Sequence, residues 1–245
     1  MSGAAGGSVA LSVVMPAFNE SEILTESVQH VVERLRARDD VNGRFELLVV
    51  ENGSTDDTLS IARRLATEMP EVRVLQRAEA DYGAALRAGL LDAAGDLVVN
   101  FDCDYYDIDF LDRAIARLRS DGGPAMVVGS KRAPGADDRR SIARRAVTWT
   151  FSTILRVGFG LNVSDTHGMK AMRRAALLPS AEQCTLGRDL FDTELIIRAE
   201  RAGLAIDEIP VSVVERRPAR SPLARRVPRT LLGLLRLRRA LGGNS

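Results

Sequence analysis

Cysteine, histidine and aromatic residues are scarce in this chain, and long apolar runs are absent. The 245 residues include two cysteines, two histidines and 4% aromatic residues. Cys103 and Cys184 lie far apart and neither belongs to a CxxC pair, which excludes a disulfide framework or a zinc site of the usual spacing. Two distant histidines form no metal-binding cluster. No apolar run reaches the about 18 residues that a membrane-spanning helix needs, so we expect none.

The sequence also shows no stretch with the composition of a linker and no pattern that resembles a secretory signal. Residues 1–8 carry no positive charge and no apolar stretch, so they do not resemble a secretory signal and are expected to be a flexible N-terminus. No Pro-rich or Ser/Gly-rich stretch interrupts the middle of the chain, which predicts one domain over residues 9–225. The apolar fraction of 45% is sufficient for a real core. Unpaired cysteines favour a cytoplasmic location.

Acidic residues are absent from residues 216–239, which contain nine arginines. We expect residues 226–245 to form a basic amphipathic C-terminal tail. A second segment of interest, residues 146–155 (AVTWTFSTIL), is uncharged and has arginines on both sides. Both segments are suited to an anionic membrane surface, and both are equally compatible with helices that pack on the domain with their arginines in water. Nucleic acid is disfavoured as a partner, because no zinc-finger spacing, RNP-like run or recognition helix accompanies the arginines.

Short apolar runs alternate with segments of helical periodicity along the first half of the chain. Strands are expected at residues 11–15, 46–50, 72–75, 97–101 and 126–129. Helical spacing of apolar residues predicts helices over residues 24–35, 59–69 and 86–94. Alternation of this kind predicts an α/β fold with a mostly parallel sheet, whose strands present their carboxyl ends at one edge. Ligands bind at that edge.

Polar motifs follow three of the predicted strands. They are PAFNE at residues 16–20, ENGSTDD at residues 51–57 and DCD at residues 102–104. Each motif alone would suit an ordinary turn or helix cap. Because all three come at the carboxyl ends of strands, we expect them to converge on one binding site.

Asp102 and Asp104 are separated by one residue and directly follow the apolar run at residues 97–101. Two carboxylates at this spacing can direct their oxygens at one hard cation, and Mg²⁺ commonly binds one or two carboxylates together with phosphate oxygens. A bound Mg²⁺ or Mn²⁺ would stabilise a diphosphate leaving group as a Lewis acid. The pair therefore predicts a site for a metal and a diphosphate.

In this order, the motifs resemble those of glycosyltransferase family 2 over about residues 9–225. The resemblance implies the GT-A fold, a Rossmann-like, mostly parallel sheet flanked by helices, and a nucleotide diphosphate sugar as donor. It covers PxxNE at residues 16–20, the acid–GS segment at residues 51–58, residues 77–89 and the DxD motif. The donor-binding residues that it implies are Pro16, Ala17, Asn19, Glu20, Glu51, Asn52, Ser54, Asp81, Gly83, Ala85, Asp102, Cys103 and Asp104.

Later segments are similar to polyprenyl-phosphate hexosyl transferases, such as dolichol-phosphate mannose and glucose synthases. They are GSKR at residues 129–132, SDTHGMKAMRR at residues 164–174, FDTE at residues 191–194 and EIPV at residues 208–211. The likeness and the positive charge together predict acceptor or phosphate contacts. The residues expected to make them are Lys131, Arg132, His167 and Lys170. Arg216 occupies the place of a phosphate-binding arginine, and Asp192 is the candidate catalytic base.

The sequence departs from the family pattern at Asn52, which replaces an acid, and at Ala219 and Pro222, which replace Gly and Lys. We expect a metal-dependent, inverting transfer of a hexose from a GDP-mannose or UDP-glucose type of donor to a polyprenyl phosphate, on the inner face of the cell membrane. One alternative is a soluble hydroxyl acceptor, for which Asp192 would act as base. The other is an inactive nucleotide-sugar-binding partner protein, which the departures favour.

Overall fold

The computed structural model describes residues 8–138, 142–187, 190–213 and 223–242. Its main sheet has seven strands in the order β3-β2-β1-β4-β7-β5-β8, and β7 runs antiparallel to both of its neighbours. A two-stranded sheet joins β6 to β9. The bounds of the strands are β1 Leu11–Ala17, β2 Phe45–Asn52, β3 Val72–Arg77, β4 Leu97–Asn100, β5 Met126–Ser130, β6 Asp137–Asp138, β7 Lys170–Arg173, β8 Ile206–Pro210 and β9 Ser212–Val213. The fold class is therefore the expected mostly parallel α/β sheet.

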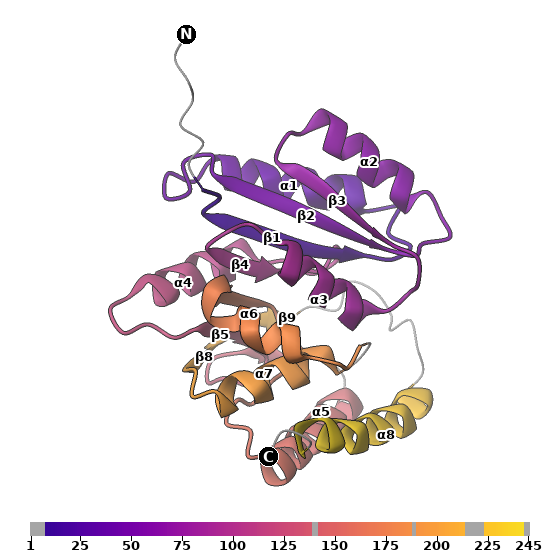
Figure 1. Cartoon of the computed structure of the whole chain (residues 1–245), viewed down its shortest axis with the longest axis vertical. Helices are drawn as coiled ribbons and strands as arrows, with labels where there is room; N and C mark the ends of the chain where they lie inside the picture. The colour runs from indigo at the N-terminus through magenta and orange to yellow at the C-terminus, as the bar shows by residue number, and fades with distance from the viewer. Residues whose placement is uncertain (1–7, 139–141, 188–189, 214–222, 243–245) are drawn as a thin grey trace.

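Helices cover both faces of the main sheet (Figure 1). Residues of β1 alternate between two apolar clusters: Val13 packs in the cluster that includes α1, α2 and α4, and Val14 in the cluster that includes α3, α6 and α7. Because both faces are covered, all residues of β1 and β2 are buried. The helices span α1 Leu24–Arg36, α2 Thr58–Glu68, α3 Tyr82–Asp92, α4 Ile108–Arg119, α5 Ile142–Phe159, α6 Arg174–Gln183, α7 Phe191–Arg201 and α8 Leu223–Gly242.

The five strands expected from the sequence are present, each within two residues at either end. The expected helices α1 and α2 also lie within one residue of their bounds. Helix α3 begins at Tyr82 rather than at Leu86, since the Asp81 carboxylate accepts a hydrogen bond from the backbone N–H of Ala84 at 2.9 Å and caps the helix there. The periodicity of apolar residues does not reveal where a capping side chain starts a helix.

Strand β7 brings a second set of residues to the functional edge of the sheet. Its first residue, Lys170, pairs with Asn100, the last residue of β4. In a parallel strand the first residue would lie at the opposite edge. The antiparallel direction of β7 therefore places Lys170 next to the loop that carries Asp102 and Asp104.

The C-terminal arginine-rich segment includes α8, which packs onto the domain. Leu234, Leu237 and Leu241 are buried in the same apolar cluster as Leu155 of α5. Arg201 of α7 also donates a hydrogen bond to the carbonyl of Leu241 at 3.1 Å. Figure 1 shows α5 and α8 at the same end of the molecule. Among the described residues, no helix is both long and apolar enough to cross a bilayer.

Candidate active site

The loops after β1 and β2 hold one another at the carboxyl edge of the sheet. Asn19 adopts a positive φ of 54°, and its Oδ1 accepts a hydrogen bond from the backbone N–H of Thr55 at 2.8 Å. The N–H of Asn19 donates to Ser54 Oγ at 3.1 Å, while the N–H of Ser54 donates to Glu51 Oε1 at 2.6 Å. The structure thus brings together Asn19, Glu51 and Ser54, all of which were predicted to bind the donor.

The loop after β3 presses against the loop after β2. Asn52 is buried, and its Oδ1 accepts a hydrogen bond from the backbone N–H of Asp81 at 3.0 Å. Gly53 has a φ of +69°, and a Cβ at this position would lie 2.9 Å from the carbonyl oxygen of Ala78. Only glycine permits this approach without strain. Asn52 and Asp81, two predicted donor-binding residues, are therefore neighbours in space.

Two predicted donor-binding side chains point away from this edge. Cys103 is buried in the core, with its Sγ directed at the carbonyl of Pro16, and Ala85 lies on the buried face of α3. Cys103 and Asp104 are the two central residues of the turn between Asp102 and Tyr105; Cys103 is 2% exposed, whereas both aspartates are partly exposed. At Cys103 and Ala85 a donor contact would have to come from backbone atoms, and both assignments stay predictions. The remaining predicted positions at this edge are Pro16, Ala17, Glu20 and Gly83.

A tight turn presents Asp102 and Asp104. The backbone groups of Asp102 and Tyr105 exchange hydrogen bonds of 3.1 and 3.2 Å. The hydroxyl of Tyr82, the first residue of α3, donates to Asp102 Oδ1 at 2.8 Å. Sequence reasoning did not select Tyr82, because its proximity to Asp102 depends on how α3 packs.

Electrostatics at this turn favour a bound cation. Burial raises the pKa of Asp102 to about 6, and the negative charges of Asp104 and Asp192 add to the rise, while the Tyr82 hydrogen bond and the charge of Lys170 oppose it. A cation bound beside Asp102 would stabilise the ionised form of this carboxylate.

The Tyr82 hydroxyl is held in its protonated, donating form. Enclosure of the hydroxyl end raises the pKa of Tyr82 well above its ordinary value, and the charges of Asp102 and Asp192 act in the same direction. Tyr82 as a whole is 38% exposed. Tyr82 is therefore a neutral hydrogen-bond donor to Asp102 at physiological pH.

Asp102 and Asp104 supply too few ligands for a metal site made of protein groups alone. The described part of the chain contains no group of three or more His, Cys, Asp or Glu side chains arranged to hold a metal. Mg²⁺ characteristically binds through one or two carboxylates and completes its coordination with phosphate oxygens and water. The two carboxylates fit a cation that binds together with a diphosphate.

Lys170 and Asp192 form a buried ion pair beside the DxD turn. Lys170 is 1% exposed and Asp192 6%. The Lys170 Nζ lies 2.7 Å from Asp192 Oδ1, at angles unsuited to a hydrogen bond, and donates to the carbonyl of Gly168 at 2.8 Å. Lys170 was expected to bind phosphate and Asp192 to be a candidate base. The structure pairs the two charges, so either role requires the buried pair to be opened.

Glu208 of β8 holds the loop formed by residues 164–168, which precedes β7. Its carboxylate accepts hydrogen bonds from the N–H of Ser164 at 2.9 Å, from Ser164 Oγ at 2.8 Å and from the N–H of Asp165 at 3.2 Å. Asp165 in turn accepts from the N–H of His167 at 3.0 Å. Glu208 belongs to the EIPV motif but was not predicted as a site residue, because its partner Ser164 is more than forty residues away in the sequence.

The same loop packs tightly against the end of β5. A Cβ on Gly168 would lie 1.9 Å from the carbonyl oxygen of Gly129, so only glycine fits there. This contact brings the loop close to the predicted phosphate-binding Lys131. Burial alone would raise the pKa of Asp165, but the charge of Lys131 and the N–H of His167 outweigh it, and the net shift is downward.

Helix α5 contacts the 164–168 loop directly. Ser152 Oγ donates to the carbonyl of Ser164 at 2.9 Å, and the Phe151 ring lies 5.6 Å from the His167 ring between centroids. Arg132 also donates to the carbonyl of Ser164, at 3.4 Å. The structure thus groups Arg132 and His167, both predicted acceptor contacts, around one loop that is held against α5. Arg216 lies outside the described residues.

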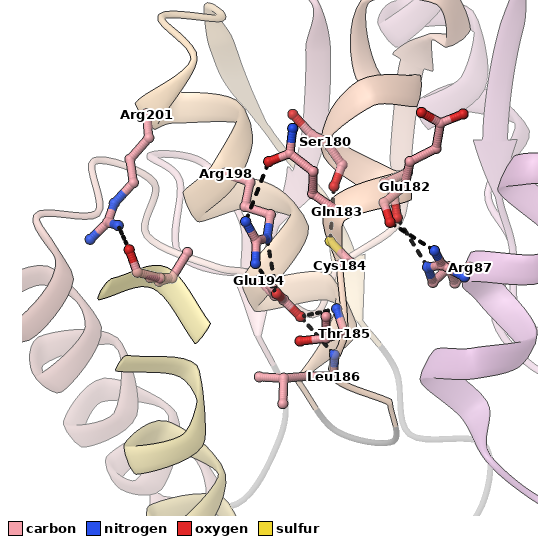
Figure 2. A network of polar contacts seen from close by, with 12 residues as sticks. Arg87, Ser180, Glu182, Gln183, Cys184, Thr185, Leu186, Glu194, Arg198 and Arg201 are labelled. Carbon is pink, nitrogen blue, oxygen red and sulfur yellow. Dashed lines mark hydrogen bonds and ion pairs between the residues drawn. The ribbon is translucent and has the colours of Figure 1, made fainter. Parts of the chain in front are cut away.

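Glu194 of the FDTE motif holds the segment that leads into α7 (Figure 2). It is fully buried, and its Oε2 accepts from the backbone N–H groups of Thr185 at 3.0 Å and Leu186 at 2.8 Å. Arg198 donates twice to its Oε1, at 2.9 and 2.7 Å. The charge of Glu194 is therefore fully compensated, and its role is to fix this segment.

The fixed segment reaches the predicted donor-binding residues through Gly187. A Cβ on Gly187 would lie 2.3 Å from Oδ2 of Asp81, so the segment approaches the cap of α3 closely. Arg87 of α3 donates to the carbonyls of Ala181 at 3.0 Å and Glu182 at 2.8 Å. Figure 2 shows Arg87 beside Glu182. Helices α3, α6 and α7 are thereby linked around one side of the site.

The strand-end loops and the order of the seven-stranded sheet define an α/β protein of the GT-A type. The model of the family "Glycosyl transferase family 2" matches residues 12–178, more than half of the chain. The chain therefore belongs to glycosyl transferase family 2.

Individual relatives are similar over most of the chain. An undecaprenyl-phosphate mannosyltransferase of Micrococcus luteus is 32% identical over 222 residues, which cover 86% of each protein. A dolichyl-phosphate beta-glucosyltransferase of Trichomonas vaginalis is 29% identical over 218 residues, covering 83% of this chain and 65% of that protein. This chain thus spans slightly less than two thirds of the length of the second relative.

A solved structure shares the fold. Glucosyl-3-phosphoglycerate synthase from Mycobacterium tuberculosis, in complex with Mn²⁺, UDP-glucose and phosphoglyceric acid, is 25% identical with a TM-score of 0.56. The match covers 88% of this chain and 74% of that chain.

Proposed function

We propose that this protein transfers a hexose from a nucleotide diphosphate sugar to a polyprenyl phosphate at a membrane surface. The observation that carries the proposal is the convergence of Asp102 and Asp104 with the buried Lys170–Asp192 pair at one edge of the sheet. An acceptor phosphate oxygen forms the new bond to the anomeric carbon as the bond to the diphosphate oxygen breaks. A single displacement of this kind inverts the anomeric centre.

The donor half of the proposal rests on the loops around Asn52 and Asp81 and on the DxD turn. Asp102 and Asp104 would hold Mg²⁺ or Mn²⁺ together with the diphosphate of the donor, as their spacing and surroundings fit such a cation. When bound, the metal supplies Lewis acidity that stabilises the departing diphosphate. The Mn²⁺ and UDP-glucose complex of the similar synthase supports this assignment.

A thermal-shift panel tests the donor. GDP, UDP and dTDP sugars would each be added with Mg²⁺ or Mn²⁺, and a ligand at about 100 times its Kd adds roughly 2.7 kcal/mol of stability. The matched variant Asp104→Asn should lose the metal-dependent part of the shift and metal-dependent turnover. Unchanged turnover of Asp104→Asn at saturating metal would contradict the metal assignment. The panel also decides the base and sugar, since the two relatives named above transfer different hexoses.

The acceptor half of the proposal rests on proton chemistry. A hydroxyl acceptor must lose a proton during attack and so needs a base that presents an available oxygen. Asp192 is 6% exposed and has Oδ1 against Lys170, which makes it poorly placed for that task. A phosphate monoester has a second pKa of about 6, arrives largely ionised and needs no base. The polyprenyl-phosphate acceptors in the names of the relatives support the same choice.

Transfer of labelled hexose to a short polyprenyl phosphate and to the matching free alcohol separates the two acceptors. We expect product from the phosphate, substantial activity in Asp192→Asn, and a raised acceptor KM or lowered turnover in Arg216→Ala. Product from the alcohol alone, lost in Asp192→Asn, would establish the hydroxyl acceptor instead. If the protein binds the donor but shows neither sugar transfer nor metal-dependent hydrolysis of the donor, it is the inactive partner protein.

Helices α5 and α8 form the surface that we assign to the anionic membrane. Their exposed large apolar side chains are Trp149, Ile154 and Val157 on α5 and Leu232 and Leu235 on α8. Exposed arginines accompany them, including Arg156, Arg236 and Arg239. Apolar side chains with basic residues around them are typical of helices that lie in a membrane interface. The contact of α5 with the 164–168 loop supports this assignment, because that loop carries a predicted acceptor contact, His167.

Sedimentation with anionic liposomes tests the surface. Each arginine near anionic lipid contributes about 1 kcal/mol, so Arg236→Gln/Arg239→Gln should weaken binding roughly 30-fold, and salt should weaken the wild type. The control Arg34→Gln/Arg64→Gln removes equal charge from α1 and α2, on the other face of the sheet, and should bind as the wild type does. Equal loss in both double variants, or no binding at low salt, would contradict the assignment.

A further inference from the structure

Tyr82 makes a contact that packing does not explain. Its side chain is 38% exposed, whereas Phe101, Phe110 and Phe191 are fully buried in the core. The specific interaction of the Tyr82 side chain is a hydrogen bond that its hydroxyl donates to Asp102 Oδ1 at 2.8 Å. An aromatic ring that gives up burial while its hydroxyl holds a carboxylate points to a role in orienting that carboxylate.

The hydroxyl is presented by a rigid part of the fold. Tyr82 is the first residue of α3, and the preceding Asp81 caps the helix through the N–H of Ala84. Asp81 is itself held by Asn52 Oδ1 at 3.0 Å. A Cβ on Gly89 would lie 2.4 Å from a side-chain methyl of β1, so α3 lies flush against the sheet. Its first residue therefore has little freedom to move relative to the DxD turn.

We propose that Tyr82 is a positioning residue for the divalent metal, acting through Asp102. The inference rests on the proposed metal–diphosphate site. The hydrogen bond from the Tyr82 hydroxyl to Oδ1 restricts the orientation of Asp102, whose remaining lone pairs would then be available, with those of Asp104, to hold the cation. Partners that orient a metal-binding side chain typically contribute about 10- to 100-fold in metal affinity. Tyr82 also connects the DxD turn to the loop after β2, because the N–H of its neighbour Asp81 donates to Asn52.

Calorimetric titration of Mn²⁺ into the protein tests the inference. Wild type, Tyr82→Phe and the control Tyr105→Phe would be titrated in the presence of saturating UDP and, in parallel, saturating GDP. Tyr105 carries a hydroxyl on the same turn as Asp102, but that hydroxyl points to the carbonyl of Ser212 at 3.4 Å. Affinity for each nucleotide in EDTA and the unfolding temperature would be measured for all three proteins.

We expect the Mn²⁺ Kd of Tyr82→Phe to rise about 10- to 100-fold, with metal-free nucleotide affinity and unfolding temperature unchanged, and Tyr105→Phe to match the wild type. An unchanged or lower Mn²⁺ Kd in Tyr82→Phe overturns the inference and leaves the proposed function intact. An equal loss of metal-free nucleotide affinity overturns it too, since Tyr82 would then contact the nucleotide. Absence of Mn²⁺ binding by the wild type with either nucleotide overturns both the inference and the metal–diphosphate site.

Discussion

Replacement of Lys170 tests whether the buried ion pair at the candidate site is an energetic unit. In Lys170→Met the chain keeps a side chain of similar length but loses the ammonium, together with its contacts to Asp192 Oδ1 and the carbonyl of Gly168. The Asp192 carboxylate, 6% exposed, then remains buried without its cation. Removal of one partner from a buried pair costs about 3–5 kcal/mol, because the other charge is left uncompensated.

The companion changes have smaller expected costs. Asp192→Asn keeps the shape of the side chain, its amide oxygen can still face the ammonium, and Lys170 retains Gly168, so we expect a loss of about 1–3 kcal/mol. In the double variant Lys170→Met/Asp192→Asn no charge is left buried. Its loss should therefore fall short of the sum of the single losses by about 2 kcal/mol, within the range of measured coupling between contacting residues.

Urea unfolding followed by far-UV circular dichroism gives the four free energies of the cycle. The exposed pair Arg64–Glu68, one helical turn apart at 3.3 Å, provides the control cycle with Arg64→Met and Glu68→Gln. Exposed pairs of this kind couple by about 0.3–0.5 kcal/mol. A coupling for Lys170 and Asp192 no larger than that of the control would refute the reasoning, and the two charges would have to be solvated in the folded protein.

Three further changes probe carboxylates that connect separate segments of the fold. Glu46→Ala should cost about 2–4 kcal/mol in urea unfolding, because the buried carboxylate binds groups of β1, β3 and the turn before β4, while an unchanged midpoint would contradict this. The pKa of Asp56 is lowered to about 2, so its stabilisation is present above about pH 4 and is lost as pH falls through about 2. Asp56→Asn should accordingly differ from wild type at pH 7 and converge with it near pH 2, and a constant difference would be inconsistent with that pKa. Glu194→Gln should loosen Thr185 and Leu186 and increase their hydrogen exchange by about tenfold or more, with equal protection arguing against the clamp.

The expected strands and two of the expected helices follow from periodicity alone, because their residues are buried on regular patterns. Strands β1 and β2 are wholly buried, and continuous apolar runs of this length identify parallel strands that are covered on both faces. Strand β7 gave no such signal. Its four residues include Lys170 and Arg173, and their pairing partners come from β4 and β5, far away in the sequence. Periodicity therefore predicted the parallel part of the sheet and not the antiparallel strand.

The residues of the candidate site also fall into a group that the sequence predicts and a group that it does not. Asp102 and Asp104 follow a strong strand, so a rule about strand ends locates them from the sequence. Tyr82 and Glu208 hold other parts of the site through contacts between residues at least twenty positions apart. A single sequence, read by itself, gives no signal for such contacts. The burial of Cys103 between the two aspartates depends on the turn from Asp102 to Tyr105, which apolar periodicity does not predict.

The direction of β7 also explains how two chemically different regions reach one place. The chain leaves α5, whose exposed side includes Trp149 and Val157, passes through the 164–168 loop and enters β7 at Lys170. Because β7 is antiparallel to β4, that entry lies beside the end of β4, from which Asp102 follows after one residue. A lipid whose chain contacts α5 would thus have its phosphate directed along residues 164–168 toward the paired carboxylates. A parallel β7 would put the same loop at the opposite edge of the sheet, and the acceptor and the metal would lie a full strand length apart.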